Sequence, residues 1–524
     1  MEGDALLTHN LNALACRKPA LAKELARLVP DGFYRGTRCA KDGSPVPLFF
    51  SGYPAHSLYS PLTEAERAVN LLRGDTYPVF LGLGAGYAIR DFLRRFPEAA
   101  CAVAELSKPA LASLLSVVDL SDLLRDRRVE LIPELSESAF RSSLRESYLP
   151  ALHGGIQVIP PSVHWLTTSD ERYKRLGDWI HGILAEIAAD FSVQSHFGRL
   201  WNRNFWRNLR VASSGYSLSA ADTSKKALIA AAGPGLEAWI GKIREERSSY
   251  CVIATDTAYG SLDGFGIVAD YFVSIDAQLV SRMHASGTFH RETTVILELC
   301  GNAGLAETAR RSGSPLFFVA GEHPLSRIAA ERFSIPSIRT GSGTVTLAAR
   351  DVAALLGFRE VTVAGADFKY ARGKPYARGT YLREIYGSAA SRTFPEETQY
   401  SALLFRTPIS RAEAGDGLFD YGTPVLDTYA AAFDSWSAPN LQRFESVSAF
   451  DYDAFAEYYR GELRRAAATP SRENPVIVSL LPFLAWYRKW RGDAGVAGGA
   501  VRATLLHDAI QLALTLIAGY TGKP

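Results

Sequence analysis

Six short apolar segments, separated by stretches long enough for helices, constrain the fold of this chain more than any other feature. They are KALIAA, CVIATD, YFVSID, TTVILE, PLFFVAG and EVTVAGAD, and they lie between residues 226 and 367. Buried strands that alternate with helices are typical of a doubly wound, mostly parallel sheet. We therefore predict an α/β protein whose central domain is a Rossmann-like parallel sheet.

The regions on either side of this sheet have different patterns. Around Tyr77, TYPVFLGLGAG, YAIRDFLRRF and CAVAEL predict a smaller Rossmann-like β-α-β unit, and after about residue 425 the pattern is helical. With 524 residues, the chain is longer than one core normally serves. We predict an N-terminal α/β domain over residues 1–215, a central domain over 216–424 and an all-helical region over 425–524. The helical region either packs on the sheet or forms contacts between subunits of a homo-oligomer.

The composition excludes several classes of function. The formal net charge is +2, with 57 basic and 55 acidic residues, so a nucleic-acid partner is not expected. The five cysteines are far apart and form no CxxC pair, which favours reduced, buried thiols in the cytoplasm and no metal site. The N-terminus lacks the pattern of a signal peptide, and the apolar stretch AIQLALTLIAGY is too short to span a bilayer.

Each expected strand of the central sheet is followed by small or polar residues. In an open parallel sheet, ligands bind beyond the carboxyl ends of the strands, so these residues would line one cleft. Any single one of them has a structural alternative, because a polar residue before a helix is a common N-cap. The six groups are Gly233-Pro234-Gly235, Asp256-Thr257, Asp276-Ala277-Gln278, Gly301-Asn302, Gly321-Glu322-His323 and Gly365-Ala366-Asp367.

A helix is expected to begin beside the hydroxyl- and glycine-rich stretch TGSGT. Val345, Ala348 and Val352 recur at helical spacing, and Gly357 is a natural stop. The free amides and partial positive charge at such a helix start suit an anion, and the alternative is a capped helix without a ligand. The candidate anion-binding residues are Thr340, Gly341, Ser342, Gly343 and Thr344.

The turn Gly233-Pro234-Gly235 is a second small turn before a predicted helix. It contains no lysine and lacks the Walker spacing, so it is not a P-loop. We expect both turns to direct their amide groups at one phosphorylated ligand.

These two turns resemble segments of the catalytic core of bacterial sialyltransferases, which carry AGxGPSL early and TSG…ALGYKE…GxDFY late. The longer pattern is more similar to the motility-associated factor (Maf) flagellin glycosyltransferases and to their relatives with a pterin-pyrophosphokinase-like domain. The shared segments are GLGAGY (82–87), FGRLWNRNFWRNL (197–209), AGPGL (232–236), DTAYGSLDGFGIVADYFVSIDAQ (256–278) and TGSG through GADFKYARGKPYARGTYL (340–382).

This resemblance implies a transferase that moves a nonulosonic acid, of the sialic, pseudaminic or legionaminic type, from a CMP-activated donor to Ser or Thr hydroxyls of flagellin. No tightly bound cofactor is implied. The turn Gly233-Pro234-Gly235 would lie at the nucleotide phosphate, and the TGSG turn under the phosphate or the sugar carboxylate. Asp256 and Asp276, with their neighbours Thr257 and Gln278, are the candidates for the nucleoside, and Asp367 would close the pocket.

Two departures from the family pattern bear on the catalytic residues. Gly235 stands where the family has a serine, so a backbone amide must replace one hydroxyl contact. The sialyltransferases also use a histidine beyond the GxDF block as a base, and this chain has no histidine between His323 and His507. The candidate bases are His323 beside Glu322, an aspartate such as Asp367, or a tyrosine among Tyr370, Tyr376 and Tyr381.

The N-terminal turn GLGAGY, followed by Glu105 after the next strand, is also similar to a nucleotide-binding fingerprint. Tyr87 replaces its last glycine, so the resemblance favours a degenerate domain with a structural or acceptor-related role over a methyltransferase or dehydrogenase. Two other functions stay open for the whole chain. One is a hydroxymethyl-dihydropterin pyrophosphokinase that uses ATP and magnesium, and the other is a non-catalytic protein that binds flagellin or an envelope partner through a decayed transferase core.

Overall fold

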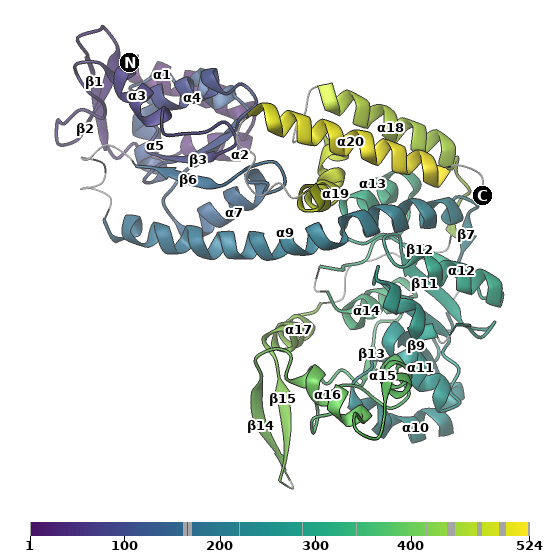
Figure 1. Cartoon of the computed structure of the whole chain (residues 1–524). Coiled ribbons are helices and arrows are strands. Elements are labelled where there is room, and N and C mark those ends of the chain that lie inside the picture. Colours follow the sequence, from purple (N-terminus) through teal and green to yellow (C-terminus); the bar gives the residue numbers. More distant parts are fainter. Residues whose placement is uncertain are drawn as a thin grey trace. The chain divides into compact units, whose positions relative to one another are not determined.

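The computed structural model describes residues 2–160, 165, 170–218, 221–285, 287–341, 343–415, 417–437, 446–468, 474–491 and 499–521. The chain forms two compact units. One holds Met1–His196 and Leu484–Ala509, and the other holds Phe197–Phe483 and Ile510–Pro524. The long helix α9 (Asp170–Ala212) supplies residues to both units (Figure 1). The division at residues 215 and 424 stays a prediction.

The first unit is built on a four-stranded parallel sheet with the strand order β5-β4-β3-β6. Strands β3 (Tyr77–Leu81) and β4 (Cys101–Ala104) are buried along their whole length, as expected of parallel strands covered by helices. Helix α4 (Tyr87–Arg95) connects them, which confirms the predicted β-α-β unit. The other elements of this unit are α1 (Glu2–Ala15), α2 (Pro19–Leu25), β1 (Tyr34–Cys39), β2 (Pro45–Phe49), α3 (Pro61–Val69), α5 (Lys108–Leu115), α6 (Ser121–Arg125), β5 (Val129–Ile132), α7 (Glu137–Ser147) and β6 (Ile156–Ile159).

The second unit contains the predicted central sheet, which has six parallel strands in the order β12-β11-β10-β9-β8-β13. The chain adds strands β8 to β12 in one direction and then returns to place β13 on the other side of β8. The topological switch point therefore lies between β8 and β13. The strands are β8 (Lys226–Ala230), β9 (Tyr250–Thr255), β10 (Tyr271–Ser274), β11 (Thr294–Glu298), β12 (Leu316–Val319) and β13 (Val361–Ala364).

Helices cover both faces of this sheet, as the apolar runs require. Helix α14 (Val345–Leu355) packs Ala348 and Val352 into a core with alternate strand residues such as Ile253. Because side chains alternate between the faces of a strand, the intervening residues belong to the other face. There, the ring of Tyr259 from α11 (Asp256–Gly264) lies 5.4 Å from the ring of Phe272.

The structure departs from the sequence expectation in two elements and in the burial of two cysteines. The helix predicted after the turn Gly233-Pro234-Gly235 begins as a 3-10 segment, Pro234–Trp239, before α10 (Ile240–Glu245). A hairpin of β14 (Ser410–Gly415) and β15 (Leu418–Gly422) was not predicted, because its strands carry no buried apolar run. Of the cysteines, all unpaired, Cys16 and Cys39 are exposed and not buried as expected. The other elements are β7 (Tyr216–Ser217), η2 (Arg247–Ser249), η3 (Leu279–Ala285), α12 (Ala303–Ser312), α13 (Pro324–Phe333), α15 (Tyr381–Ala389), α16 (Glu396–Leu404), α17 (Pro424–Asp434) and β16 (Ser446–Val447).

The C-terminal region is mostly helical, with α18 (Tyr452–Ala468), α19 (Pro475–Arg491) and α20 (Gly499–Thr521), but it is not all-helical as predicted, because strand β16 lies within it and pairs with β7. Its first helix packs on α9. The fully buried ring of Trp206 lies 5.2 Å from that of Tyr459 and 5.8 Å from that of Phe455. Among the described helices, none combines the length and the apolar character needed to cross a membrane.

Candidate functional site

The carboxyl ends of the six strands in the second unit lie along one edge of the sheet, because all neighbouring pairs are parallel. The six polar groups predicted from the sequence therefore line the same edge. This edge is where ligands bind in open α/β sheets. The contacts along it show which groups are held by the protein and which are not.

At the switch point, Asp367 locks the turn of Gly233, Pro234 and Gly235. The carboxylate accepts a hydrogen bond of 2.8 Å from the amide of Gly235. A Cβ atom at Gly233 would lie 2.1 Å from Asp367 Oδ2, and one at Gly235 would lie 2.5 Å from Oδ1. The glycines are thus needed because an acid from beyond β13 lies against the turn. The amide of Gly235, expected at a phosphate, is already used, and the role of this turn at a phosphate stays a prediction.

The TGSGT turn precedes helix α14, which begins at Val345 as predicted, but the hydroxyls of Thr340 and Thr344 accept hydrogen bonds from backbone amides. Thr344 caps the helix by accepting from the amide of Thr346. The hydroxyl of Thr340 accepts a hydrogen bond of 3.0 Å from the amide of Glu322. Ser342 lies outside the described residues.

The two glycines of this turn are required for different reasons. Gly343 has a φ of 71°, in the left-handed region that favours glycine. A Cβ atom at Gly341 would lie 2.3 Å from a carboxylate oxygen of the exposed Glu322. Gly343 is therefore required by its backbone conformation, and Gly341 by the carboxylate of Glu322 beside it.

Asp256 is the most enclosed of the acids predicted at this edge, at 1% exposure. Its Oδ2 accepts a hydrogen bond of 2.8 Å from the Ser274 hydroxyl, across the ends of β9 and β10. Its Oδ1 accepts from the amide and the hydroxyl of Thr257. The carboxylate is therefore fixed in orientation at the edge of the sheet.

His284 approaches the same carboxylate and was missed by the sequence reasoning. Its Nδ1 lies 3.6 Å from Oδ1 of Asp256, and its ring lies 4.5 Å from that of Tyr381. The residue is 6% exposed, and neither ring nitrogen has a hydrogen-bond partner among the described residues. No motif marks this histidine. The one signal in the sequence is its place in the segment that follows β10.

Asp276 and Gln278 stabilise the segment after β10. Asp276 Oδ1 accepts from the amide of Gln278 at 3.0 Å, and its carbonyl accepts from the amide of Asn302. The side chain of Asn302 donates to the carbonyl of Gln278 at 2.5 Å. These contacts tie the turn after β10 to the turn after β11.

Two buried asparagines of helix α9 donate hydrogen bonds to the backbone of the same two turns. Asn204 donates to the carbonyls of Ala277 and Cys300 at 3.1 and 3.3 Å. Asn208 donates to those of Leu299 and Gly301, both at 2.9 Å. Two of the three asparagines of the FGRLWNRNFWRNL segment therefore position the edge of the sheet.

A second buried acid, Glu298, also escaped the sequence reasoning because it is the last residue of the apolar strand β11. It accepts from the amide of Gly321 at 3.0 Å and from the hydroxyl of Ser326 at 2.6 Å. Burial raises the pKa of its carboxyl group. The acid joins the ends of β11 and β12.

His323 has a structural role at the start of α13. Its Nδ1 accepts a hydrogen bond of 3.2 Å from the amide of Leu325, so the ring caps the helix. Burial of the ring lowers its pKa to about 3. With Nδ1 engaged, the neutral ring carries its proton on Nε2 and has no free basic nitrogen.

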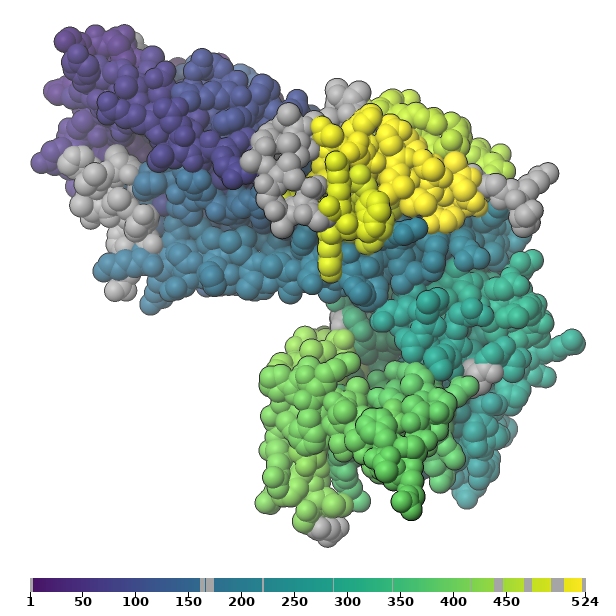
Figure 2. Space-filling model, in the orientation of Figure 1, coloured from purple at the N-terminus to yellow at the C-terminus, as the bar shows by residue number. Residues whose placement is uncertain are grey.

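A cleft of about 860 Å³ opens beside this edge, along the loop of residues 372–380 and the β14–β15 hairpin. Segments 381–404 and 410–422 form part of the green outer surface in Figure 2. Four basic side chains line the cleft together with two acids and several aromatic rings. The charged lining residues are Arg372, Lys374, Arg378, Arg383, Glu396 and Glu397.

Ion pairs engage three basic residues that lie in or near the TGSGT and GADF segments. Arg339 pairs with the buried Asp351, Lys369 with Asp420, and Lys374 with Glu237. Tyr376 connects the cleft to the enclosed acid and histidine. It lines the cleft, and its ring lies 6.5 Å from that of Tyr381, which contacts His284.

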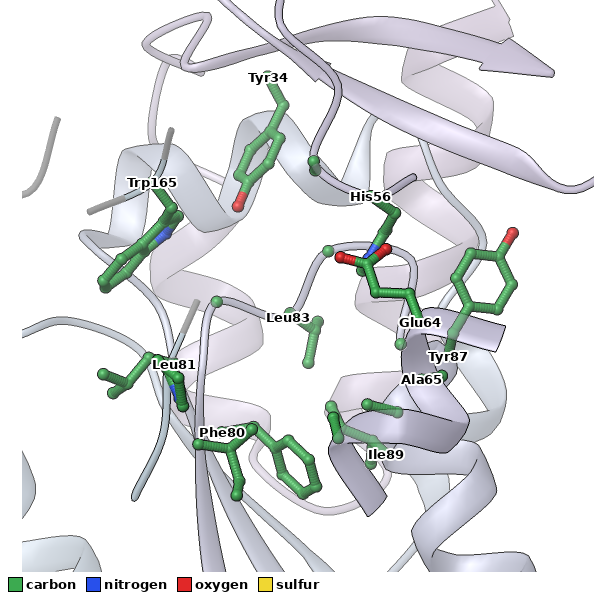
Figure 3. Close-up of a pocket in the computed structure, with 18 of the residues that line it drawn as sticks. Tyr34, His56, Glu64, Ala65, Phe80, Leu81, Leu83, Tyr87, Ile89 and Trp165 are labelled. Atoms are coloured by element: carbon green, nitrogen blue, oxygen red, sulfur yellow. The ribbon is translucent and has the colours of Figure 1, made fainter. Parts of the chain in front are cut away.

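The glycine turn of the first unit borders a separate cavity of about 130 Å³ (Figure 3). The side chains of His56 and Tyr34 point toward the turn around Leu83 in this view. The amide of Ala85 donates to Nε2 of His56 at 2.9 Å, and burial lowers the pKa of this histidine to about 4. A Cβ atom at Gly84 would lie 2.3 Å from the same nitrogen. The imidazole of His56 therefore occupies the space next to Gly84 and Ala85 in this turn.

Glu105, compared in the sequence with a ribose-binding acid, turns inward at this cavity. It is fully buried and accepts from the amide of Leu83 at 2.6 Å and from the hydroxyl of Tyr34 at 3.4 Å. Burial raises its pKa to about 7. The acid fastens the glycine turn, which favours the structural role given to this domain.

Comparisons with known proteins relate the central domain to one protein family and the whole chain to one solved structure. Residues 203–373 match the family described as 6-hydroxymethylpterin diphosphokinase MptE-like. An uncharacterised protein of Treponema pallidum (strain Nichols) is 35% identical over 228 residues, which cover 43% of this chain and 79% of that protein. Another from the same organism is 36% identical over 169 residues, 32% of this chain and 79% of the relative.

A solved structure extends the likeness over nearly the whole chain. The Maf glycosyltransferase from Magnetospirillum magneticum AMB-1 aligns with 99% of this chain and 91% of its own, with a TM-score of 0.52 and 15% identity. The predicted fold class is confirmed. The chain thus belongs to one family with the two Treponema pallidum proteins, carries an MptE-like domain at residues 203–373, and has the fold of a Maf glycosyltransferase.

Proposed function

We propose that this protein is a glycosyltransferase that moves a nonulosonic acid from a CMP-activated donor to Ser or Thr hydroxyls of flagellin. One observation carries the proposal. The likeness to a Maf glycosyltransferase covers 99% of the chain, flanking regions included, whereas the MptE-like match ends at residue 373. The regions on both sides of the central sheet also align with the transferase structure. This extent of likeness favours a transferase over a kinase, which would need the central domain alone. Its free, widely spaced cysteines fit an enzyme that works in the cytoplasm.

The chemistry of the cleft supports an anionic, partly aromatic donor. A CMP-activated nonulosonic acid carries a phosphodiester and a carboxylate. Arg372, Arg378 and Arg383 supply positive charge, and Tyr376 and Tyr400 supply rings that suit a base or a sugar face. The volume of about 860 Å³ lies within the range of roughly 300–1,000 Å³ that is usual for ligand sites.

The proposed reaction is a single displacement at the anomeric carbon. The acceptor oxygen forms a bond to this carbon, and the bond from the carbon to the phosphate oxygen breaks. CMP leaves with the bonding electrons, and cationic side chains and backbone amides stabilise its charge. We assign Asp367 and His323 to positioning, since one holds the Gly235 turn and the other caps α13. Asp276, with Thr257 and Gln278, keeps the nucleoside role expected from the resemblance, whereas both carboxylate oxygens of Asp256 accept hydrogen bonds within the protein.

The pterin diphosphokinase is the second candidate, and the family match over residues 203–373 favours it. Such an enzyme would bind ATP with magnesium, and the acids at the strand ends would hold the metal. A thermal-shift comparison separates the two functions, because a ligand at 100 times its Kd stabilises the folded state by about 2.7 kcal/mol. CMP without metal should raise Tm if the transferase is correct, and ATP should do so only with magnesium if the kinase is correct.

Transfer itself is tested with purified full-length protein, a CMP-activated nonulosonic acid and flagellin, by CMP release and by the mass of the flagellin. Flagellin that gains one nonulosonic-acid mass for each CMP released supports the proposal. CMP release without modified flagellin identifies a hydrolase or another acceptor. Absence of both CMP binding and CMP release would refute the transferase.

A further inference from the structure

The enclosed pair of His284 and Asp256 calls for an explanation that packing does not supply. Buried polar groups are nearly always hydrogen-bonded, because an unpaired one in a low-dielectric interior is costly. Both ring nitrogens of His284 are buried without such a partner among the described residues, although the residue is only 6% exposed. The ring is therefore held at the edge of the sheet at a cost to stability. A catalytic role is one explanation of such an unsatisfied group.

The geometry of the pair is that of a base and the group that orients it. Nδ1 of His284 lies 3.6 Å from Asp256 Oδ1, slightly beyond a hydrogen bond. The Ser274 hydroxyl fixes the other oxygen of Asp256 at 2.8 Å. Catalytic hydrogen bonds are often long without substrate and shorten in the complex. With Nδ1 directed at the carboxylate, Nε2 is the nitrogen available for a proton.

The pair lies where the proposed chemistry takes place. Asp256 follows β9, and His284 comes from η3 (Leu279–Ala285), which follows β10. The ring of Tyr381 contacts His284 at 4.5 Å, and Tyr376 lies between Tyr381 and the basic cleft. Through these two rings the pair is in contact with the residues that line the cleft.

We propose that His284 is the general base of the transfer and that Asp256 positions it; the inference rests on the proposed function. As the acceptor oxygen bonds to the anomeric carbon and CMP departs, the hydroxyl proton moves to Nε2 of His284. The carboxylate of Asp256 stabilises the imidazolium, which then releases the proton to solvent. His284 would thus take the role that a histidine beyond the GADF block has in the sialyltransferases. It also replaces His323 as the candidate base, because Nδ1 of His323 accepts a hydrogen bond from the amide of Leu325.

The test compares full-length His284→Gln with the wild type in CMP binding, transfer rate and pH profile. We expect CMP affinity within about threefold of wild type and transfer about 10²–10⁴-fold slower, the usual contribution of a general base. We also expect the fall in rate at low pH to disappear in the variant. Asp256 and Tyr381 are the titratable groups that contact His284, so Asp256→Asn should slow transfer and shift the low-pH limb. His290→Gln is the matched control, because its ring is half-exposed and pairs with Asp263 at 2.7 Å.

The outcomes separate this inference from the proposed function. If wild-type protein transfers sugar and His284→Gln does so at an unchanged rate, or His323→Gln is the variant that loses the low-pH limb, the inference is wrong and the function stands. If the wild type neither binds CMP nor transfers sugar, both fall. Should His284→Gln fold poorly, His284→Ala assayed with added imidazole replaces it. Recovery of the rate with imidazole supports a base, and a rate that imidazole leaves unchanged contradicts one.

Discussion

Asp367 and Gly235, 132 residues apart in the sequence, are joined by a hydrogen bond of 2.8 Å from the glycine amide to the carboxylate. The bond spans the switch point between β8 and β13, where the order in which the chain adds strands to the sheet reverses. It couples the turn after β8 to the GADF segment. The shape of the edge at this point therefore depends on two segments that are distant in sequence.

Substitution of Gly235 by alanine tests this coupling. The new Cβ would lie 2.5 Å from Asp367 Oδ1, so the carboxylate or the turn must move. We expect a loss of about 1–3 kcal/mol in the free energy of unfolding, typical of overpacking, together with weaker CMP binding. Urea unfolding and calorimetry measure the two effects. Gly241→Ala is the control, because no atom lies within 4 Å of its added Cβ and its helix should gain stability.

Asn208 gives a prediction about how α9 supports the edge. Asn208→Ala removes two hydrogen bonds to the carbonyls of Leu299 and Gly301 and leaves both unpaired in a buried place. Each buried group left without a partner costs about 1–3 kcal/mol. Urea unfolding should show this loss, whereas Arg207→Ala, at an exposed position of the same helix, should stay within about 0.5 kcal/mol of wild type. Equal stabilities for the two variants would contradict the supporting role of Asn208.

The sequence was a good guide to the elements but a poor one to the contacts between them. All six strands of the central sheet were predicted, because a strand buried on both faces must be a continuous apolar run. The start of α14 followed from the spacing of Val345, Ala348 and Val352. His284 and Glu298 could not be singled out, because what distinguishes them is burial beside residues far along the chain. The β14–β15 hairpin is largely exposed and carries no apolar pattern that would reveal it.

Glu105 makes the stability of the first unit depend on pH. Its pKa rises from 4.5 to about 7 on folding, because burial disfavours the charged form. Between these values the folded state binds more protons than the unfolded state, so the contribution of Glu105 to stability is lost as pH rises from about 4.5 to about 7. At about 1.4 kcal/mol per pKa unit, the total approaches about 3 kcal/mol.

Glu105→Gln removes this titration and keeps an acceptor for the Leu83 amide. The difference in unfolding free energy between wild type and variant should therefore change by up to about 3 kcal/mol across this range, with the wild type losing ground at the higher pH. Chemical denaturation at closely spaced pH values measures it. A difference that is flat from pH 4.5 to 7 would show that Glu105 is not buried as described.

Arg383 tests whether the cleft recognises an anion. It lines the cleft near Glu396 and Glu397, and a phosphate or carboxylate in the cleft would gain a charge-assisted contact from it. Such a contact contributes about 1.5–3 kcal/mol, so Arg383→Ala should weaken CMP binding about 10- to 100-fold and reduce its dependence on salt. Arg310→Ala is the control, because Arg310 is an exposed residue of α12 that pairs with Glu307 at 3.7 Å. If both variants bind CMP equally well, the donor does not use this part of the cleft, and the nucleotide site must be sought at the strand ends alone.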